Sequence, residues 1–407
     1  MMERKVVSRL VYLDGHATTA LAPEAEAAMV PYWSVSAGNA QSPHVRGQRA
    51  AAAVEAARCD VAQLVGAEPQ EIVFTSGATE ANNLILLGVA DAARKAGSGR
   101  TKLIASAIEH KSVLATLEEL GRRGFEIELA PVTTGGVVAL DALERLIDDK
   151  TLLVSVMGAN NEVGVIQPLA AVSRLARAKG ALVHSDIAQL AGKLPVDVVA
   201  LDLDYASLSG HKLHGPMGVG AAFISGLAAL KPRAQVFGGG QEGGLRAGTL
   251  PTPLVVGFGA AAKLLRQDLV EAGAQQERLA QKLLKGLSEQ QVRVVQNAVS
   301  SERLPGSLSL QIIGADADEV VGRLSDVVCL STGSACSSGQ ISTSHVLRAM
   351  SIPNDDALNI VRLYIDRYID DSDIDFVVAH LSAAIRAVTG CRWVGDPVGS
   401  AHEVHSH

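Results

Sequence analysis

Short apolar runs of strand length alternate with longer segments whose apolar residues repeat at helical spacing. The apolar runs do not alternate cleanly with polar residues, which is typical of strands covered on both faces. The segments between them, such as 113–124 and 169–180, each end in basic residues and glycine, as helices often do. Strand, helix and strand in repetition predict a mostly parallel sheet with helices on both sides. The predicted strands are 102–108, 152–158, 181–186, 204–210 and 220–225.

The alternation of strand and helix patterns changes after about residue 260. A long helical stretch, 260–287, leads into short strand-like runs and further helices. We therefore predict an α/β protein with a large domain over 14–260 and a smaller α+β domain over 261–390. Residues 1–25 are expected to pack on the smaller domain, and 391–407 form a tail.

Composition narrows the class of protein. Hydrophobic residues make up 48% of the 407 residues, charged residues 19%, and the net charge is −7. These values are ordinary for a globular protein and give no reason to expect nucleic acid as a partner. The N-terminus lacks the apolar stretch of a signal peptide, and no apolar run is long enough to span a membrane.

The cysteines and histidines argue against a disulfide scaffold or a metal centre. The four cysteines are widely spaced and form no CxxC pair, which fits a reducing cytosol and a cytoplasmic protein. The three histidines of the tail are more typical of a frayed end than of ligands, so we predict no metal site. The cysteines are Cys59, Cys329, Cys336 and Cys391.

The segment 207–220, SLSGHKLHGPMGVG, carries the most informative lysine. Lys212 follows a predicted strand and has small or apolar neighbours, whereas most lysines lie on the surface. Partial burial lowers the pKa of a lysine, which can then form a Schiff base with an aldehyde. Ser209 and His211 could hold a phosphate beside it. On its own, this signal does not exclude a surface lysine.

A buried carboxylate strengthens the case for a cofactor. Asp186 ends a predicted buried strand in HSDIAQ, where a carboxylate is costly unless it meets a donor or a cation. A helix N-cap would satisfy it. The protonated pyridine nitrogen of pyridoxal phosphate (PLP) is the other candidate, because a carboxylate keeps that proton in place. Gln189, about one turn later, could reach the ring oxygen.

Three further segments place polar groups after predicted strands. In TSGATEANN, Ala78 and Thr79 would begin a helix, whose free N–H groups and dipole favour an anion, although an ordinary capped helix is the better explanation of this motif alone. His110 could stack on a flat ring, and Asn161 follows another buried strand; a loop histidine and a turn former are the simpler explanations. The ends of parallel strands are where such sheets bind ligands.

Together these motifs resemble one family. SGHKLHGPMGVG, TSGATEANN, EHKSVL, NNEVGVIQP, DIAQ and GGGQEGGLRAGTLP are similar to the cysteine desulfurases of the NifS/IscS type, in the class-V aminotransferase family of fold-type I PLP enzymes. The resemblance runs from about Leu13 to residue 390, and several motifs in the same order make it specific.

The resemblance implies a role for each matching residue. Lys212 would carry PLP and move the Cα proton, His110 would stack on the ring and act in acid–base steps, and Asp186 would pair with the pyridine nitrogen. Thr249 would reach the phosphate of the other subunit, which implies a homodimer. Ring contacts are implied for Gln189 and Asn161, and phosphate contacts for Ala78, Thr79, Ser209 and His211.

The resemblance assigns the nucleophile to Cys336. It lies in STGSACSSGQ, which resembles the long mobile loop of the iron–sulfur-cluster class, and glycine, serine and alanine suit an exposed loop. Attack on the sulfur of PLP-bound L-cysteine would leave a persulfide and release alanine. An acceptor protein would then take the sulfur for iron–sulfur cluster assembly or thiolation. An inert buried thiol describes Cys59 and Cys329 better.

The match fails at the expected substrate pocket. The family reads R-L-S-x-G-R where this chain has RLYIDR from Arg362 to Arg367. Arg362 could still clamp the substrate carboxylate, but Tyr364 and Asp366 could shrink the pocket, repel an anion or draw the arginine into an ion pair. His16 stands where asparagine or alanine is usual, and Gly243 where arginine is common.

Two other functions therefore stay open. One is a PLP enzyme acting on another amino acid, such as an epimerase, aminotransferase or selenocysteine lyase, which the altered arginine segment favours and the Cys336 segment opposes. The other is a non-catalytic dimeric relative, which the retained lysine and its surroundings oppose. Sulfide release from cysteine separates the first from a desulfurase, and a protein that gains no colour with PLP would indicate the second.

Overall fold

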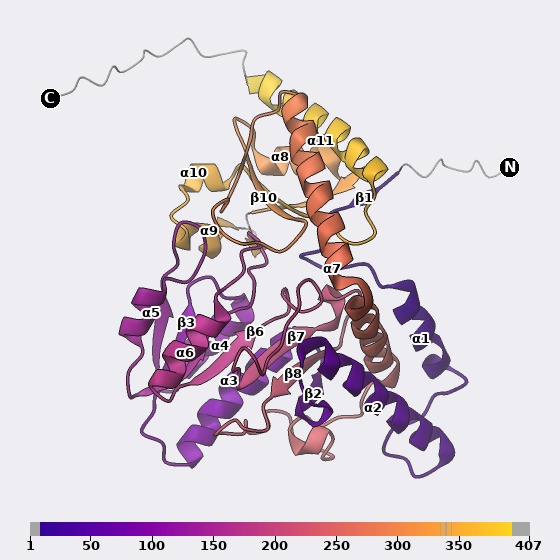
Figure 1. Cartoon of the computed structure of the whole chain (residues 1–407), viewed down its shortest axis with the longest axis vertical. Helices are drawn as coiled ribbons and strands as arrows, with labels where there is room; N and C mark the ends of the chain where they lie inside the picture. The colour runs from indigo at the N-terminus through magenta and orange to yellow at the C-terminus, as the bar shows by residue number, and fades with distance from the viewer. Residues whose placement is uncertain (1–8, 334, 338–339, 343, 393–407) are drawn as a thin grey trace.

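The computed structural model describes residues 9–333, 335–337, 340–342 and 344–392. A seven-stranded sheet occupies the first two thirds of the chain, with strand order β2-β8-β7-β6-β5-β3-β4 (Figure 1). Only β8 runs antiparallel to its neighbours, so the predicted mostly parallel sheet is confirmed. The strands are β2 (Ile72–Thr75), β3 (Lys102–Ser106), β4 (Glu126–Ala130), β5 (Thr151–Ser155), β6 (Leu182–Asp186), β7 (Tyr205–Ser209) and β8 (Gly220–Ile224).

Helices cover both faces of this sheet, as the uninterrupted apolar strands require. The apolar residues of α3 and α4 pack on one face. Those of α2, α5, α6 and the first part of α7 pack on the other. The helices are α1 (Pro23–Trp33), α2 (Val45–Val65), α3 (Ala78–Lys95), α4 (Lys111–Arg122), α5 (Leu140–Leu146), α6 (Leu169–Ala178) and α7 (Thr252–Glu289), with 3-10 turns at Pro69–Glu71, Gly210–Lys212 and Glu242–Gly244.

A second, antiparallel sheet follows, with order β12-β15-β10-β9. Its core includes Val11 and Leu13, because β1 pairs with β11, so the N-terminal segment packs where we expected it. The elements of this region are β1 (Val11–Tyr12), β9 (Val294–Gln296), β10 (Ser307–Ile312), α8 (Ala317–Leu324), β11 (Val328–Cys329), β12 (Ser331–Thr332), β13 (Ala335–Ser337), β14 (Gln340–Ser342), α9 (His345–Ala349), α10 (Asn354–Ala357), β15 (Ile360–Tyr364) and α11 (Asp371–Arg392).

Helix α7 joins the two regions. Figure 1 shows it running from the seven-stranded sheet to the smaller sheet at the top of the view. Its first half contributes Val255 and Phe258 to the large core, and its second half contributes Leu279 and Leu283 to the small one. The boundary predicted at residue 260 thus falls inside this helix and stays a prediction, as does the tail, of which 393–407 lie outside the described residues.

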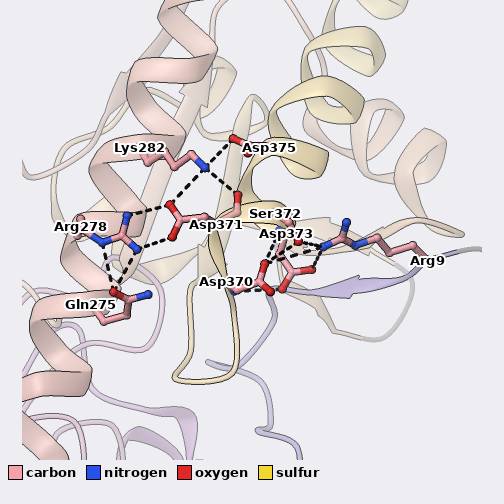
Figure 2. Close-up of polar contacts among 9 residues, drawn as sticks. All are labelled: Arg9, Gln275, Arg278, Lys282, Asp370, Asp371, Ser372, Asp373 and Asp375. Atoms are coloured by element: carbon pink, nitrogen blue, oxygen red, sulfur yellow. Dashed lines mark hydrogen bonds and ion pairs between the residues drawn. The ribbon is translucent and has the colours of Figure 1, made fainter.

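The start of α11 is tied to α7 and to the N-terminal segment by ion pairs (Figure 2). Arg278 of α7 donates to both oxygens of Asp371 at 2.8 and 2.7 Å, and Lys282 lies 2.7 Å from Asp375. Arg9 lies 2.6 Å from Asp373. Most of these groups are exposed to solvent, so each pair contributes little to stability. No helix of the described residues is long and apolar enough to cross a membrane.

The largest stability effect in the large domain is expected at a buried ion pair. Arg58 donates to both oxygens of Glu242 at 2.8 and 2.7 Å, and Glu242 also accepts from the N–H of Phe74. The Glu242 side chain is only 2% exposed. Replacing it with alanine would leave the guanidinium buried without this partner, and the free energy of unfolding should fall by about 3 kcal/mol.

Denaturant unfolding followed by circular dichroism would measure that loss. Glu55 is the matched control, because it pairs with the same arginine at 3.2 Å but is 63% exposed. Glu55→Ala should change the free energy of unfolding by less than about 0.5 kcal/mol. Equal losses in the two variants would contradict a special role for the buried pair.

Candidate active site

A cavity of about 430 Å³ lies at the carboxyl ends of the parallel strands. Its volume is within the range of small-molecule sites. Most of the cofactor residues predicted from the sequence line this cavity, so the structure brings them together. The lining includes Ala78, Thr79, His110, Asn161, Asp186, Gln189, Ser209, His211 and Lys212.

The beginning of α3 forms one wall. The N–H groups of its first turn have no partner within the helix and, with the helix dipole, favour an anion. Gly77 caps the helix with φ at +153°, a conformation that side chains rarely allow. A Cβ on Gly220 of β8 would come within 2.5 Å of the Gly77 Cα, so both positions need glycine. Ser209 and His211 line the same cavity.

Asp186 ends β6 and is held by two donors. Its Oδ1 accepts from the N–H of Ala188 at 3.0 Å, and its Oδ2 accepts from Asn82 at 2.8 Å. Each oxygen keeps a lone pair for another donor. Asn82 also donates to Ser112 at 2.9 Å, so it links the carboxylate to the start of α4. Asn82 was not predicted from the sequence, although it lies one turn after Thr79 in the same motif.

His110 caps α4, and its hydrogen bonds determine its tautomer. Its Nδ1 accepts from the N–H of Ser112 at 3.1 Å. In the neutral ring the proton is therefore on Nε2. His211 is neutral near pH 7, because burial and the nearby Lys212 lower the pKa of its imidazole to about 4.

Lys212 ends the short turn after β7 and is partly buried. Its Nζ donates to the carbonyl oxygens of His16 and Ala17, both at 2.6 Å. Burial, followed by the charge of Arg362, lowers the pKa of this amine to about 8, despite opposing effects of Asp14 and Asp186. A useful fraction of the amine is therefore unprotonated near neutral pH, as an attack on an aldehyde requires.

A second cavity of about 380 Å³ shares His110 and Asn161 with the first. It is also lined by Arg362 and by 331–333, which directly precede the segment of Cys336. Cys336 belongs to β13, which pairs antiparallel with β14, with Cys336 opposite Ile341. We expected an exposed loop here. The structure instead has a short two-stranded ribbon, in which the backbones of β13 and β14 pair. The Cys336 side chain lies outside the described residues.

Arg362 reaches this cavity already paired. It lies 2.8 Å from Asp14 and donates to the carbonyl oxygen of Asn161 at 3.1 Å, while its Nε is buried without a partner. The expected internal ion pair exists, but its acid is Asp14 and not Asp366. Asp366 is buried and accepts from the N–H of Tyr368, and burial raises the pKa of its carboxyl group.

Tyr364 does not line either cavity, so the expected narrowing of the carboxylate pocket is wrong. Its ring lies against His16, with centroids 4.7 Å apart, and its hydroxyl accepts from Gln276 at 3.1 Å. A Cβ on Gly15 would come within 2.5 Å of the ring, which explains the glycine there. Tyr364 instead borders an enclosed space of about 20 Å³ behind Lys212.

The remaining sequence predictions fall outside these cavities. Thr249 is exposed and does not line the cavity of its own chain as far as the structure describes it. Gly243 lies in open space with φ at +61°. Cys59 and Cys329 are free thiols in α2 and β11, as their patterns predicted, but both are partly exposed, so the expectation of full burial is wrong.

Comparisons with known proteins agree with this geometry. The aminotransferase class-V family model matches residues 11–377, and the chain belongs to this family of PLP enzymes. It is 39% identical over 376 residues to "Cysteine desulfurase IscS" of Rickettsia bellii, covering 92% of this chain and 91% of the relative.

Solved structures give the same result. A structure titled "NIFS-LIKE PROTEIN" has a TM-score of 0.85 at 36% identity, covering 93% of this chain and all of that one. One titled "SspA in complex with cysteine" has a TM-score of 0.77 at 34% identity, covering 88% and 100%. The fold-type I assignment is therefore confirmed.

Proposed function

We propose that this chain is a PLP-dependent cysteine desulfurase, which converts L-cysteine to L-alanine and passes the sulfur to Cys336 for iron–sulfur cluster assembly or thiolation. The observation that carries the proposal is a pair of neighbouring cavities, which share His110 and Asn161 as lining residues. One holds Lys212 and Asp186, and the other holds Arg362 beside the segment that leads to Cys336. The cysteine desulfurases among the relatives support the same reaction.

The first cavity fits PLP in three respects. The N-terminus of α3, with Ala78, Thr79, Ser209 and His211, suits the phosphate. Asp186 has lone pairs free for the pyridine N–H, and Lys212 offers an amine with a lowered pKa. When bound, the cofactor withdraws electrons from the substrate Cα.

The chain's own groups then have distinct tasks. Lys212 takes the Cα proton and returns one to the substrate carbon. His110, whose Nε2 carries the proton, donates toward the cavity. The Cys336 thiol loses its proton, the thiolate attacks the substrate sulfur, and the Cβ–S bond breaks with its electron pair going to Cβ. Cβ takes up one proton, which balances the one lost by Cys336, so a persulfide and alanine result. The proposed homodimer would bring Thr249 of the partner subunit to the phosphate, which its exposure permits.

Arg362 is proposed to bind the substrate carboxylate, because it lines the second cavity beside the segment that leads to Cys336. Arg362→Lys keeps the charge but loses the planar fork. The KM for cysteine should rise about 10-fold, as for the loss of one charged hydrogen bond, with a smaller change in kcat. Steady-state alanine formation measures both constants.

Arg367→Lys is the control for that measurement. Arg367 pairs with Asp268 at 2.6 Å and does not line the second cavity. The KM of the Arg367→Lys variant for cysteine should stay within about twofold of the wild-type value. An unchanged KM in Arg362→Lys would remove Arg362 from substrate binding.

The proposed function is tested by incubating the purified PLP-loaded protein with cysteine. Alanine, sulfide in the presence of a reductant, and a mass increase of one sulfur atom on the Cys336 peptide are expected together. Turnover of another amino acid without sulfide would indicate another enzyme of this fold. A protein that gains no visible absorbance with PLP would indicate a non-catalytic relative.

A further inference from the structure

A buried polar cluster lies behind the cofactor cavity, where the chain departs from its family. Its centre is Gln189, which lines the cavity and makes three hydrogen bonds. Its Oε1 accepts from Lys193 Nζ at 2.5 Å and lies 3.0 Å from His16 Nδ1. Its Nε2 donates to the carbonyl oxygen of His16 at 3.0 Å.

Lys193 is a buried amine without an acidic partner in the part of the chain that the structure describes. It is 5% exposed, and no carboxylate of the described residues lies within ion-pair distance of its amine. Its Nζ instead lies 4.7 Å above the ring of Tyr364. The charged groups that act on it are Lys212, Arg362 and Asp366, and burial lowers its pKa well below the usual value. A buried lysine without a counter-ion costs stability, which suggests that its position serves another purpose.

These contacts determine how the amide of Gln189 is oriented. The carbonyl oxygen of His16 can only accept, so Nε2 must face it, and Oε1 then lies on the side of Lys193, whose Nζ donates to it. One N–H of Nε2 bonds that carbonyl, and the second N–H is left for a ligand in the cavity. The opposite orientation would place the Oε1 of Gln189 against the carbonyl oxygen of His16, and both of these atoms can only accept.

His16 makes this orientation more rigid. Its ring is 1% exposed, with Nδ1 facing Gln189 and Nε2 lying 2.8 Å from the hydroxyl of Ser307. A neutral ring with the proton on Nδ1 donates to Gln189 and accepts from Ser307. Because Ser307 begins β10 of the smaller sheet, His16 connects the amide to the second domain.

We infer that Lys193 and His16 are positioning residues, which hold the amide of Gln189 so that its N–H faces the ring oxygen of the cofactor. The inference rests on the proposed function, because it requires PLP in the cavity. That N–H stabilises negative charge on the oxygen and thereby sets the pH at which the bound cofactor loses its proton.

Lys193→Met tests this inference, since methionine keeps the length of the chain and a buried apolar residue should not impair folding. The pH midpoint of the visible absorbance of the bound cofactor should rise by about 0.5 to 1 unit, the size expected for one hydrogen bond. The dissociation constant for PLP should rise about 5-fold. Gln276→Leu is the control, because Gln276 belongs to the same cluster through Tyr364 but does not contact Gln189, and it should change neither value.

A double-mutant cycle separates an effect through the orientation of Gln189 from a direct effect of the Lys193 charge on the cofactor. In a Gln189→Leu background, Lys193→Met should move the midpoint by less than half as much, because the amide through which it acts is gone. Equal shifts in both backgrounds, or no shift in the single variant, would overturn the inference. A wild-type protein without visible absorbance after PLP is added would overturn the proposed function instead.

Discussion

Lys212→Ala is expected to abolish the covalent attachment of PLP and to lower alanine formation from cysteine by at least about 10³-fold, the upper range for loss of one acid–base group. The reason is geometric. Lys212 and Asp186 line the first cavity, and the amine of Lys212 donates to two carbonyl oxygens, each 2.6 Å away. Borohydride reduction followed by peptide mass analysis identifies the amine that carries the cofactor.

Two other lysines make this test specific. Lys193 is the second buried amine near the cavity, so a cofactor found on its peptide would refute the assignment of Lys212. Lys231 is exposed, and Lys231→Ala should keep the label and full turnover. Normal alanine formation by Lys212→Ala would refute its catalytic role.

The pKa of Lys212 gives the same prediction a pH dependence. Only the unprotonated amine attacks an aldehyde, and the pKa of this amine is about 8. Uptake of PLP by the cofactor-free protein should therefore accelerate as the pH rises toward 8 and level off above it. A lysine with an ordinary pKa near 10.4 would continue to accelerate through pH 10. Stopped-flow absorbance distinguishes the two profiles.

Much of this site could be predicted from the sequence, because short apolar runs show where the strands end. The five predicted strands match β3, β5, β6, β7 and β8 closely, and the polar residues after them meet at one edge of the sheet. Asp186 and Lys212 follow neighbouring strands, β6 and β7, so parallel pairing alone brings them to one cavity. The tasks given to each residue stay predictions.

The errors came from contacts between distant segments. Tyr364 stands where the family has a serine in its arginine segment, which led us to expect it beside the pocket of Arg362. Residues 14–16 run alongside β15, so Arg362 meets Asp14 while Tyr364 meets His16. Side chains two residues apart on a strand are separated by roughly 7 Å, enough to reach different cavities. The sequence around β15 contains no pattern that predicts residues 14–16 as its neighbour.

Lys193 could have been found by the reasoning that found Lys212. It also stands among small and apolar residues, in QLAGKLPV. What the sequence could not supply was its partner, because the contact with Gln189 depends on the turn after β6, and that with Tyr364 depends on β15. Burial of an amine is thus predictable from its neighbours, whereas the group that it orients is not.

Cys336→Ser is expected to keep PLP and to bind cysteine, yet to form no persulfide and to lose at least about 10³-fold in alanine formation, the order seen when an essential nucleophile is removed. A serine hydroxyl is hardly ionised near neutral pH and does not accept sulfur as a thiolate does. Because Arg362, Lys212 and Asp186 are untouched, the spectral change on adding cysteine should persist.

Cys59 and Cys329 supply the controls, since both are partly exposed free thiols outside the two cavities. Burial raises the pKa of the Cys329 thiol, which makes it a poorer nucleophile at neutral pH. Cys59→Ser and Cys329→Ser should each keep alanine formation within about twofold of wild type. If Cys336→Ser also kept full sulfide and alanine production, sulfur would leave the substrate without this thiol. The thiol of the added reductant would then take the sulfur directly from the substrate as its own persulfide, which a second reductant thiol reduces to sulfide, while Lys212 and Arg362 bind and deprotonate the amino acid.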